Sequence, residues 1–563
     1  MLLVVGWDGA CFELADRFRG EGRMPALDGL LDRGSAFRVR STVPAVTFPA
    51  WTSFLTGAHP DHHGVTDFTM PLAGSYGVRF VNSTHRRLPT ILAAMASAGL
   101  RVGAYGMPAT YPPEGRCVFE VCGFDTPLGA SGSDAAAHPP GLAASIRRRF
   151  GRLGIEGIAQ SEIDAGWHER ARRQLPGDVR LRTRIVRELA REHALDVLVV
   201  HFMEPDTAAH HFWQFHDAGS PRRREGPAAA LAEVYAALDA SLAELLEAAG
   251  PGARVMLLSD HGSAGASDRV LFWNRWLAGR GLLAFRETAS EPVAAKLKRG
   301  ALAMVPGRWQ ARAFAAAGSL AARVESGARF AGIDWSRTAV FSDEVPYFPS
   351  LRFNVAGREP RGTVAPADVD ALAARTTGEL LAMRDPFDGG AVVERVRRRE
   401  ELFDGPFASR YPDLVLELRR PGGYAYCAGS SRGGLEREWM RRLRGDEASG
   451  AKGRATSGVH SDHGMAVLAG PAVAGPAARD GGPRAAGDDS RAALPECSLA
   501  DLGVTALAMA GLAPSAAMQG RALVGFARLA QGPSGERGRE ERDYGEDEER
   551  EVAERLRALG YLP

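Results

Sequence analysis

A hydroxyl, a carboxylate and an imidazole occupy positions in this sequence from which they could act on a substrate together. Thr47 begins the motif Thr-Phe-Pro, and a threonine hydroxyl is a poor nucleophile at neutral pH unless a base or a metal lies beside it. Asp206 and His210 are four residues apart, so a helix beginning after Pro205 would place both on one face, one turn apart. A carboxylate and an imidazole placed in this way can share one cation.

Acidic residues follow three apolar runs that are typical of strands buried on both faces. The runs cover residues 2–5, 195–202 and 254–259, and the acidic residues after them are Asp8, Asp206 and Asp260. In open α/β sheets, ligands bind at the carboxyl ends of the strands. We therefore expect the three carboxylates to lie at one edge of a sheet as metal ligands.

Two of the candidate residues, Asp8 and Thr47, also have a purely structural interpretation. Asp8 could cap or turn the backbone before a helix, and Thr47 could be only the cap of the helix that follows it. Three independent caps at the ends of three buried strands are a less economical explanation than one shared site.

The candidate imidazoles come from the same segments of the chain. His261 directly follows Asp260 and precedes a glycine that permits a tight turn. His460 is the candidate for a late ligand, and His463 is the second choice for that role. His211 would point away from the face that carries His210, so we expect it to be structural.

The elements that must position these residues alternate between apolar strands and amphipathic helices, which predicts an α/β fold. Further strands are expected at 101–105, 413–418 and 465–468, and helices at 24–33, 88–98, 181–193, 228–249, 366–383, 502–512 and 551–559. The Thr47 motif should begin another helix, because Pro49 is tolerated in a first turn.

The expected organisation is one catalytic domain over residues 1–530 with a charged C-terminal tail and helix over 531–563. Three stretches within the domain are expected to be insertions, at about 127–185, 285–335 and 471–493. The segment 292–322 is alanine-rich and predicts helices, whereas 471–493 has no periodicity and predicts a surface segment.

The composition excludes several classes of partner. The chain has 563 residues, with 69 Lys and Arg against 68 Asp and Glu, so the net charge of +1 favours neither a nucleic-acid polymer nor an anionic membrane. No apolar run is long enough to span a bilayer, and no basic and apolar leader precedes residues 2–5. The five cysteines form no CxxC pair, which fits reduced thiols, and we expect a soluble cytoplasmic protein. The sequence leaves the oligomeric state open.

Taken in order, these motifs resemble the alkaline phosphatase superfamily, most closely its type I phosphodiesterase/nucleotide pyrophosphatase branch. The matching features are an Asp after the first strand, Thr-Phe-Pro, Asp-x-x-x-His, Asp-His-Gly and a late Gly-x-His, together with Thr110-Tyr111-Pro112-Pro113. The resemblance implies an α/β three-layer sandwich of the alkaline-phosphatase type, with a mainly parallel central sheet and inserted cap segments. It also implies metal-dependent hydrolysis of a small phosphate ester or nucleotide.

The resemblance further assigns the ligands of two divalent metal ions. One ion would bind Asp206, His210 and His460, and the other would bind Asp8, Asp260, His261 and the Thr47 oxygen. Mixed imidazole and carboxylate ligands suit Zn²⁺, with Mn²⁺ as the alternative. Two ions roughly 4 Å apart would hold the attacking and leaving oxygens of an in-line displacement at phosphorus. Thr47 would form a covalent intermediate that water then hydrolyses.

The sequence departs from the family pattern at one position. Nucleotide pyrophosphatases carry an Asn shortly after the His-Gly, whereas Phe68 stands there in this chain. A different oxygen donor, or an apolar substrate group near Phe68, would account for the change. Tyr111 could line the substrate pocket as well.

Several other activities share these residues. A phosphomonoesterase would need further cationic donors for a dianionic phosphate, and Arg358 is the candidate. A phosphotransferase has no signal of its own in the sequence. A sulfatase needs a Cys or Ser that is matured to formylglycine, which Thr47 cannot supply. A metal-free binding protein on the same fold is the non-enzymatic alternative, and the presence of all seven expected ligands argues against it.

Overall fold

The computed structural model describes residues 1–72, 74–127, 135–160, 163–164, 166–286, 330, 332–431, 436–444, 447, 456–471, 494–523 and 541–559. The helices expected at 292–322 and the segment expected at 471–493 lie outside the described residues, apart from residue 471.

Within the described residues, nine strands form a central sheet with the spatial order β19-β2-β18-β9-β1-β8-β5-β6-β7. Their bounds are β1 Leu2–Trp7, β2 Gly34–Arg40, β5 Val102–Met107, β6 Phe119–Cys122, β7 Ala137–His138, β8 Val197–Phe202, β9 Arg254–Leu258, β18 His463–Ala469 and β19 Glu496–Ser498. β1 pairs in parallel with β8 and β9, β5 with β6 and β8, and β2 with β19. β18 is antiparallel to both its neighbours, as β7 is to β6, so the sheet is mainly parallel as predicted.

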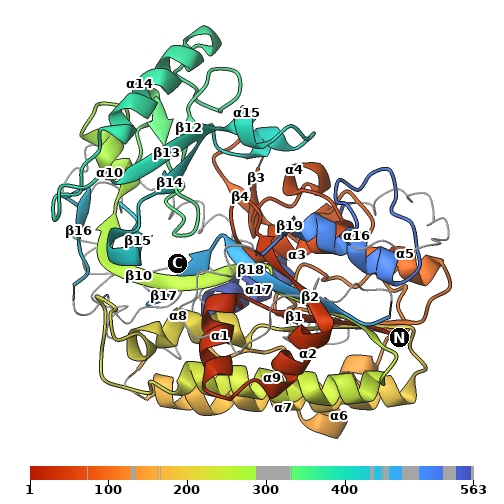
Figure 1. The fold of residues 1–563 in the computed structure, drawn as a ribbon. Coiled ribbons are helices and arrows are strands. Elements are labelled where there is room, and N and C mark those ends of the chain that lie inside the picture. The colour runs from red at the N-terminus through yellow and green to blue at the C-terminus, as the bar shows by residue number, and fades with distance from the viewer. Residues whose placement is uncertain are drawn as a thin grey trace.

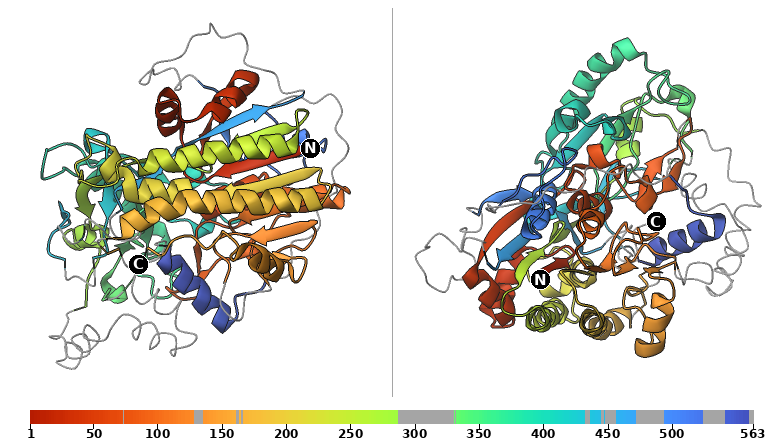
Figure 2. Two further views of the ribbon diagram at one scale, coloured as in Figure 1. Left: turned by 90° about the horizontal axis from the view of Figure 1, so that it is seen from below. Right: turned by 90° about the vertical axis from the view of Figure 1, so that its right-hand side faces the viewer.

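Helices cover both faces of this sheet and complete three layers. The alternation of side chains along β1 sends Leu3 and Val5 to one face and Leu2 and Val4 to the other. The first face is covered by α1 Phe12–Gly20, α2 Pro25–Arg33, α6 Leu142–Phe150, α7 Trp167–Glu192, α8 Glu204–His216 and α9 Ala230–Ala249. α7 and α9 run side by side across it (Figure 2). The second face is covered by α3 Thr47–Thr56, α5 Ile91–Ser97 and α16 Leu499–Met509.

A smaller unit with its own apolar core stands beside one end of the central sheet (Figure 1). Its sheet has the order β11-β12-β14-β13, with β11 Val340–Phe341, β12 Ser350–Phe353, β13 Val393–Arg398 and β14 Leu414–Leu418. The helices α10 Trp273–Ala278, α14 Val369–Leu381 and α15 Arg399–Leu402 belong to it. We call residues 332–428 of this unit the cap.

Two further sheets connect the cap and the body. The long strand β10 Gly262–Leu271 pairs with β15 Ala425–Ala428, β16 Met440–Arg442 and β17 Gly458–Ser461. The hairpin of β3 Thr69–Pro71 and β4 Val78–Phe80 follows the short helix α4 Pro60–His63. No helix within the described residues is both long and apolar enough to cross a membrane.

The C-terminal helix α17 Glu546–Ala558 packs onto the body instead of projecting from it. Val552, Leu556 and Leu559 are buried in one cluster with Phe48 and Phe68. Arg555 donates hydrogen bonds to backbone carbonyls of residues 124 and 155. The last described segment therefore supports the residues next to Thr47.

One stretch expected to be an insertion contributes to a long helix of the body. The second half of residues 127–185 forms the beginning of α7, which starts at Trp167 instead of residue 181. Pro176 inside the helix and many arginines hide its periodicity, but Leu175, Val179 and Ile185 are buried against the helical layer. Residues 167–185 thus belong to the core of the body, and α7 is not the solvated helix that its basic composition suggests.

Candidate metal centre

The topology brings the expected acidic residues to one edge of the central sheet. β9, β1 and β8 are neighbours and parallel, so their carboxyl ends lie together. Asp8 follows β1, Asp260 follows β9, and Asp206 lies in the first turn of α8 after β8. Gly9 is essential to this approach, because its φ is +68° and an added Cβ would lie 3.1 Å from the Cβ of Asp206.

The late histidine arrives through β17. β17 runs antiparallel to β10, with His460 opposite Ser263, so His460 comes next to the residues at the start of β10. Gly458 lies so close to α8 that a Cβ there would meet the carbonyl oxygen of Ala209 at 2.1 Å. This close contact brings β17 against the helix that carries Asp206 and His210.

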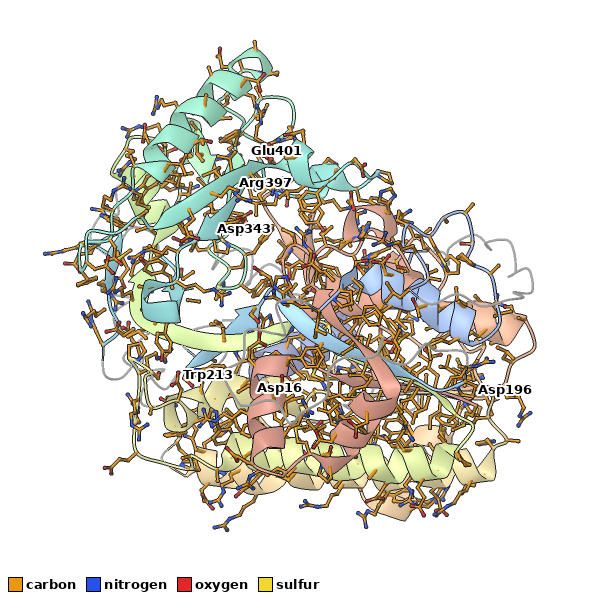
Figure 3. The ribbon with its side chains drawn as sticks, in the orientation of Figure 1. Asp16, Asp196, Trp213, Asp343, Arg397 and Glu401 are labelled. Atoms are coloured by element: carbon orange, nitrogen blue, oxygen red, sulfur yellow. The ribbon has the colours of Figure 1, made fainter. Side chains whose placement is uncertain are left out.

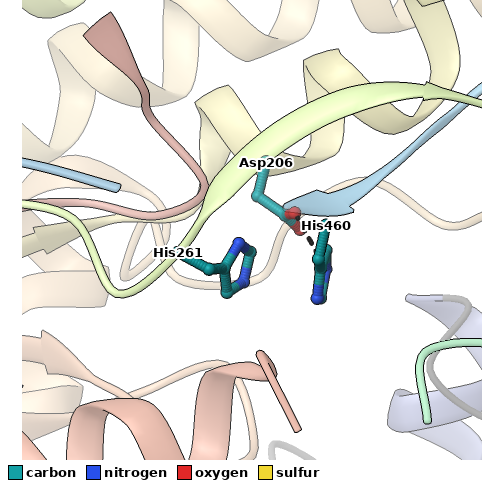
Figure 4. A group of neighbouring side chains, drawn as sticks. All are labelled: Asp206, His261 and His460. Carbon is teal, nitrogen blue, oxygen red and sulfur yellow. Dashed lines mark ion pairs between the residues drawn. The ribbon is translucent and has the colours of Figure 1, made fainter. Parts of the chain in front are cut away.

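Two groups of potential ligands result, and they share one imidazole. Asp206, His261 and His460 form the first, with ligand atoms within 4.8 Å of one another (Figure 4). Asp8, Asp260 and His261 form the second, with the same spacing. His261 Nε2 lies 3.3 Å from Asp260 Oδ2 and 3.6 Å from Asp8 Oδ1. Its ring stacks on that of His460 with centroids 3.7 Å apart.

His210 lies beside the first group. Its Nε2 is 3.1 Å from Asp206 Oδ1, and His460 Nε2 is 3.4 Å from the same oxygen. His210 Nδ1 donates to the carbonyl oxygen of Gly458, and His460 Nδ1 donates to that of Ala45, both at 2.7 Å. A carbonyl oxygen can only accept, so Nδ1 carries the proton in both rings. In the neutral rings Nε2 then presents a lone pair to a carboxylate oxygen, an arrangement that a shared cation makes favourable.

Polar atoms of the second group, and the hydroxyl of Thr47, have no hydrogen-bond partner among the described residues. These buried atoms are Asp8 Oδ1, Thr47 Oγ1, Asp260 Oδ2 and His261 Nε2. Leaving a buried polar atom unpaired costs about 1–3 kcal/mol, so such atoms are expected to contact a bound group. Burial, followed by the charge of Asp8, raises the pKa of Asp260 well above its usual range. Burial and the neighbouring His460 lower the pKa of His261 to about 3. A divalent cation fits this donor set.

Thr47 is the first residue of α3 and is fully buried. Its neighbours contact both groups of ligands: the carbonyl oxygen of Ala45 accepts from His460, and Trp51 Nε1 donates to Asp8 Oδ2 at 3.1 Å. The helix N-terminus favours an anion at this position. The segment around Thr47 therefore contacts His460 of the first group and Asp8 of the second.

Two side chains that hold Asp8 were missed in the sequence. His201, on β8, lies with its Nε2 2.9 Å from Asp8 Oδ2, the oxygen that Trp51 also contacts. These two donors leave Oδ1 facing His261. A histidine within residues 197–202, which are otherwise apolar, was the only signal of such a role.

A buried ion pair fixes the start of α8. Arg182, on α7, donates two hydrogen bonds of 2.9 Å to the carboxylate of Glu204, and both side chains are buried. The same guanidinium donates to the carbonyl oxygens of His201 and Gly154. Arg182 therefore links β8, the strand whose His201 contacts Asp8, to the first turn of α8, which carries Asp206.

The remaining candidates lie elsewhere. His463 pairs with Glu496 at 3.1 Å, and His211 contacts Gln160 at 2.7 Å, so neither belongs to the two groups. Phe68 packs on Phe48 with ring centroids 4.3 Å apart. Tyr111 donates to Glu548 at 2.6 Å. Both are buried: Phe68 lies in one cluster with Leu556, and Tyr111 stacks on Tyr544.

A cleft of about 870 Å³ opens from the ligand cluster toward the cap. His210 and His460 are part of its wall, as are the loop 40–46 before Thr47 and the cap residues 346–349. A substrate in this cleft would reach the cluster directly.

A model of the type I phosphodiesterase/nucleotide pyrophosphatase family matches residues 2–466. Phosphonoacetate hydrolase from Sinorhizobium meliloti 1021, solved with phosphonoacetate, is similar with a TM-score of 0.52 and 16% identity, over 90% of this chain and 95% of that chain. Murine ectonucleotide pyrophosphatase/phosphodiesterase 5 has a TM-score of 0.45 and 11% identity, over 91% of this chain and 95% of that chain. The alkaline phosphatase PafA has a TM-score of 0.49 and 13% identity, over 93% of this chain and 98% of that chain. No curated protein sequence matches the chain. The first of these structures supports the fold.

Proposed function

Since the chain belongs to the type I phosphodiesterase/nucleotide pyrophosphatase family of the alkaline phosphatase superfamily, we propose that it is a metal-dependent phosphodiesterase with Thr47 as its nucleophile. The observation that carries the proposal is the set of buried, unpartnered atoms of Asp8, Thr47, Asp260 and His261. Their types match a cation site that includes a hydroxyl, which a purely structural cap at Thr47 would not require.

We assign Asp206, His210 and His460 to one cation, and Asp8, Asp260, His261 and Thr47 to the other, with Zn²⁺ as the favoured metal and Mn²⁺ as the alternative. When bound, the two cations would supply Lewis acidity for the hydroxyl and the phosphoryl oxygens. Thr47 Oγ1 would give its proton to solvent and bond to phosphorus while the bond from phosphorus to the leaving oxygen breaks, and the alcohol or phenol would leave after taking a proton from solvent. Water would then release the phosphoryl group from Thr47, and the N-terminus of α3 would favour the anionic group throughout.

Arg358 gives a reason to prefer a diester over a monoester. A dianionic monoester would need added cationic donors, and Arg358 was the candidate for that role. Its guanidinium instead donates to both carboxylate oxygens of Asp413, at 2.6 and 2.7 Å, within the cap. Arg358 therefore stabilises the cap, and the proposed site does not depend on it.

We further propose that the catalytic unit extends beyond residue 530, because α17 contributes to the cluster that supports Phe48. The expected boundary of the catalytic domain at residue 530 would separate this helix from the residues it covers.

Metal analysis and two chromogenic substrates test the function. We expect about two divalent ions per chain, faster hydrolysis of bis(4-nitrophenyl) phosphate than of 4-nitrophenyl phosphate, and loss of both activities after chelation. Faster monoester cleavage would move the chain to the phosphomonoesterases. A protein that binds no metal and turns over neither substrate would contradict the proposal.

A further inference from the structure

The spaces on the two sides of Thr47, the proposed nucleophile, are filled differently. On one side, Phe68 and Tyr111 are buried by the chain itself. Tyr544 stacks on Tyr111 with ring centroids 5.9 Å apart, and Leu556 packs in the same cluster as Phe68. Because this space is occupied by residues 541–559, an ester group of the substrate has no room there.

On the other side, the chain that precedes Thr47 runs along the cleft. The loop 40–46 forms one wall, and Val46 immediately precedes Thr47. Val43 and Pro44 contribute apolar surface to this wall. A substrate phosphorus next to Thr47 would therefore direct one of its ester groups along this loop.

The opposite wall is aromatic and is held in place by the cap. Tyr347 and Phe348 line the cleft from the loop that follows Asp343 (Figure 3). The buried carboxylate of Glu344 accepts hydrogen bonds from the backbone amides of Asn274 and Ser431 at 2.8 and 2.7 Å. This anchoring preorganises the loop, which lowers the entropic cost of binding against it.

Tyr347 also ties the wall to the body. Its hydroxyl donates to Asp67 Oδ1 at 2.8 Å, and its ring lies 6.4 Å from that of Phe68. Phe68 in turn packs on Phe48, the residue after Thr47. The position that carries Asn in nucleotide pyrophosphatases thus belongs, in this chain, to an aromatic row that runs from the nucleophile to the cleft.

Of the five arginines that line the cleft in the described part of the chain, three are paired with carboxylates of the cap. Arg397 donates to Glu401 at 3.0 Å, and both are labelled on the cap in Figure 3. Arg419 donates to Asp388 at 2.7 Å, and Arg395 lies 3.7 Å from Glu417. These carboxylates offset the positive charge of three arginines, and the apolar surface of Val43, Pro44, Tyr347 and Phe348 is available to an uncharged ester group.

Building on the proposed function, we propose that the cleft is a subsite for a bulky, apolar ester group, aryl or branched alkyl, of a phosphodiester. A volume of about 870 Å³ far exceeds the need of a phosphoryl group and is in the range of sites for drug-sized ligands. The side chain that tests the subsite is Phe348, which lines the cleft and whose ring is held in the cap by Tyr411, with centroids 6.5 Å apart.

Substrate selectivity tests the subsite. We would measure kcat/KM for bis(4-nitrophenyl) phosphate and methyl 4-nitrophenyl phosphate, which share a leaving group and differ in the second ester group. In Phe348→Ala the ratio of the two values should fall by about tenfold relative to the unsubstituted protein, because an apolar contact to the aryl group is lost. In Phe348→Leu this ratio should fall less. Phe387→Ala is the matched control, since Phe387 is an exposed ring on the cap outside the cleft lining, and its ratio should not change.

A variant at Tyr111, on the side filled by residues 541–559, tests whether the ester group binds there instead of in the cleft. Tyr111→Phe removes only the hydrogen bond to Glu548 and should leave the ratio unchanged. An unchanged ratio in Phe348→Ala, or a changed ratio in Tyr111→Phe, would overturn the subsite while the diesterase activity stands. If the unsubstituted, metal-loaded protein hydrolyses neither diester, the proposed function fails and the subsite fails with it.

Discussion

His201 offers a sharp test of how the protein prepares Asp8 for a cation. Asp8 Oδ2 accepts from His201 Nε2 at 2.9 Å and from Trp51 Nε1 at 3.1 Å, which leaves Oδ1 for a metal. The informative change is His201→Leu, which keeps an apolar side chain in β8 and removes the donor. His201→Gln is the matched variant, since its amide nitrogen can donate in place of Nε2.

The expected magnitude comes from this one contact. A hydrogen bond to a charged group contributes about 1.5–3 kcal/mol. Since about 1.4 kcal/mol corresponds to a factor of ten in affinity, the loss predicts binding weaker by about 10- to 100-fold at the Asp8 group. The Gln variant should lose much less. Trp51 still holds Asp8 in both variants, so the other group, with Asp206, should bind as before.

Competition with a chelator of known affinity measures both dissociation constants. Circular dichroism of the metal-free proteins is the control that both variants fold. Two results would refute the reasoning: equal affinity in the Leu variant and the unsubstituted protein, or equal weakening in the Leu and Gln variants. The first would mean that His201 does not orient Asp8, and the second that it acts through packing.

Three further predictions follow from the same geometry. Arg182→Met should destabilise the metal-free protein by about 3–5 kcal/mol because it leaves Glu204 charged and buried, and denaturation midpoints should recover in part when Glu204→Met is added. Burial raises the pKa of Glu344 to about 7, above its value near 4.5 in the unfolded chain, so the free energy of unfolding should fall as the pH rises between these values. Glu344→Gln should flatten this part of the curve of unfolding free energy against pH. An unchanged slope in the variant would contradict the prediction. His460→Ala should lower the metal content, whereas His463→Ala should keep about two ions per chain; the reverse pattern would exchange their roles.

The central body was predictable because its strands are buried on both faces. The apolar runs at 2–5, 195–202 and 254–259 became β1, β8 and β9, and the Thr-Phe-Pro motif begins α3 as expected. Parallel neighbours necessarily bring their carboxyl ends together, so the placement of three acidic residues at one edge followed from the strands alone.

Other parts could not be predicted, for physical reasons that differ. The first turns of α7 carry Pro176 and alternate arginine with apolar residues, which weakens the helical pattern. The role of His201 depends on which strand neighbours β1, and the burial of Phe68 depends on a helix almost 500 residues later. Contacts of this range are set by tertiary packing and leave no local signal.

The measurement that tests the central claim most directly is the metal content and diesterase rate of Thr47→Ala, made on one preparation. Thr56→Ala is the control, because Thr56 is a buried threonine of the same helix whose hydroxyl bonds to the carbonyl oxygen of Thr52. The account predicts that Thr47→Ala keeps bound metal but hydrolyses bis(4-nitrophenyl) phosphate no faster than the buffer, while Thr56→Ala stays active. Substantial turnover by the Thr47→Ala protein would contradict the assignment of Thr47 as the nucleophile.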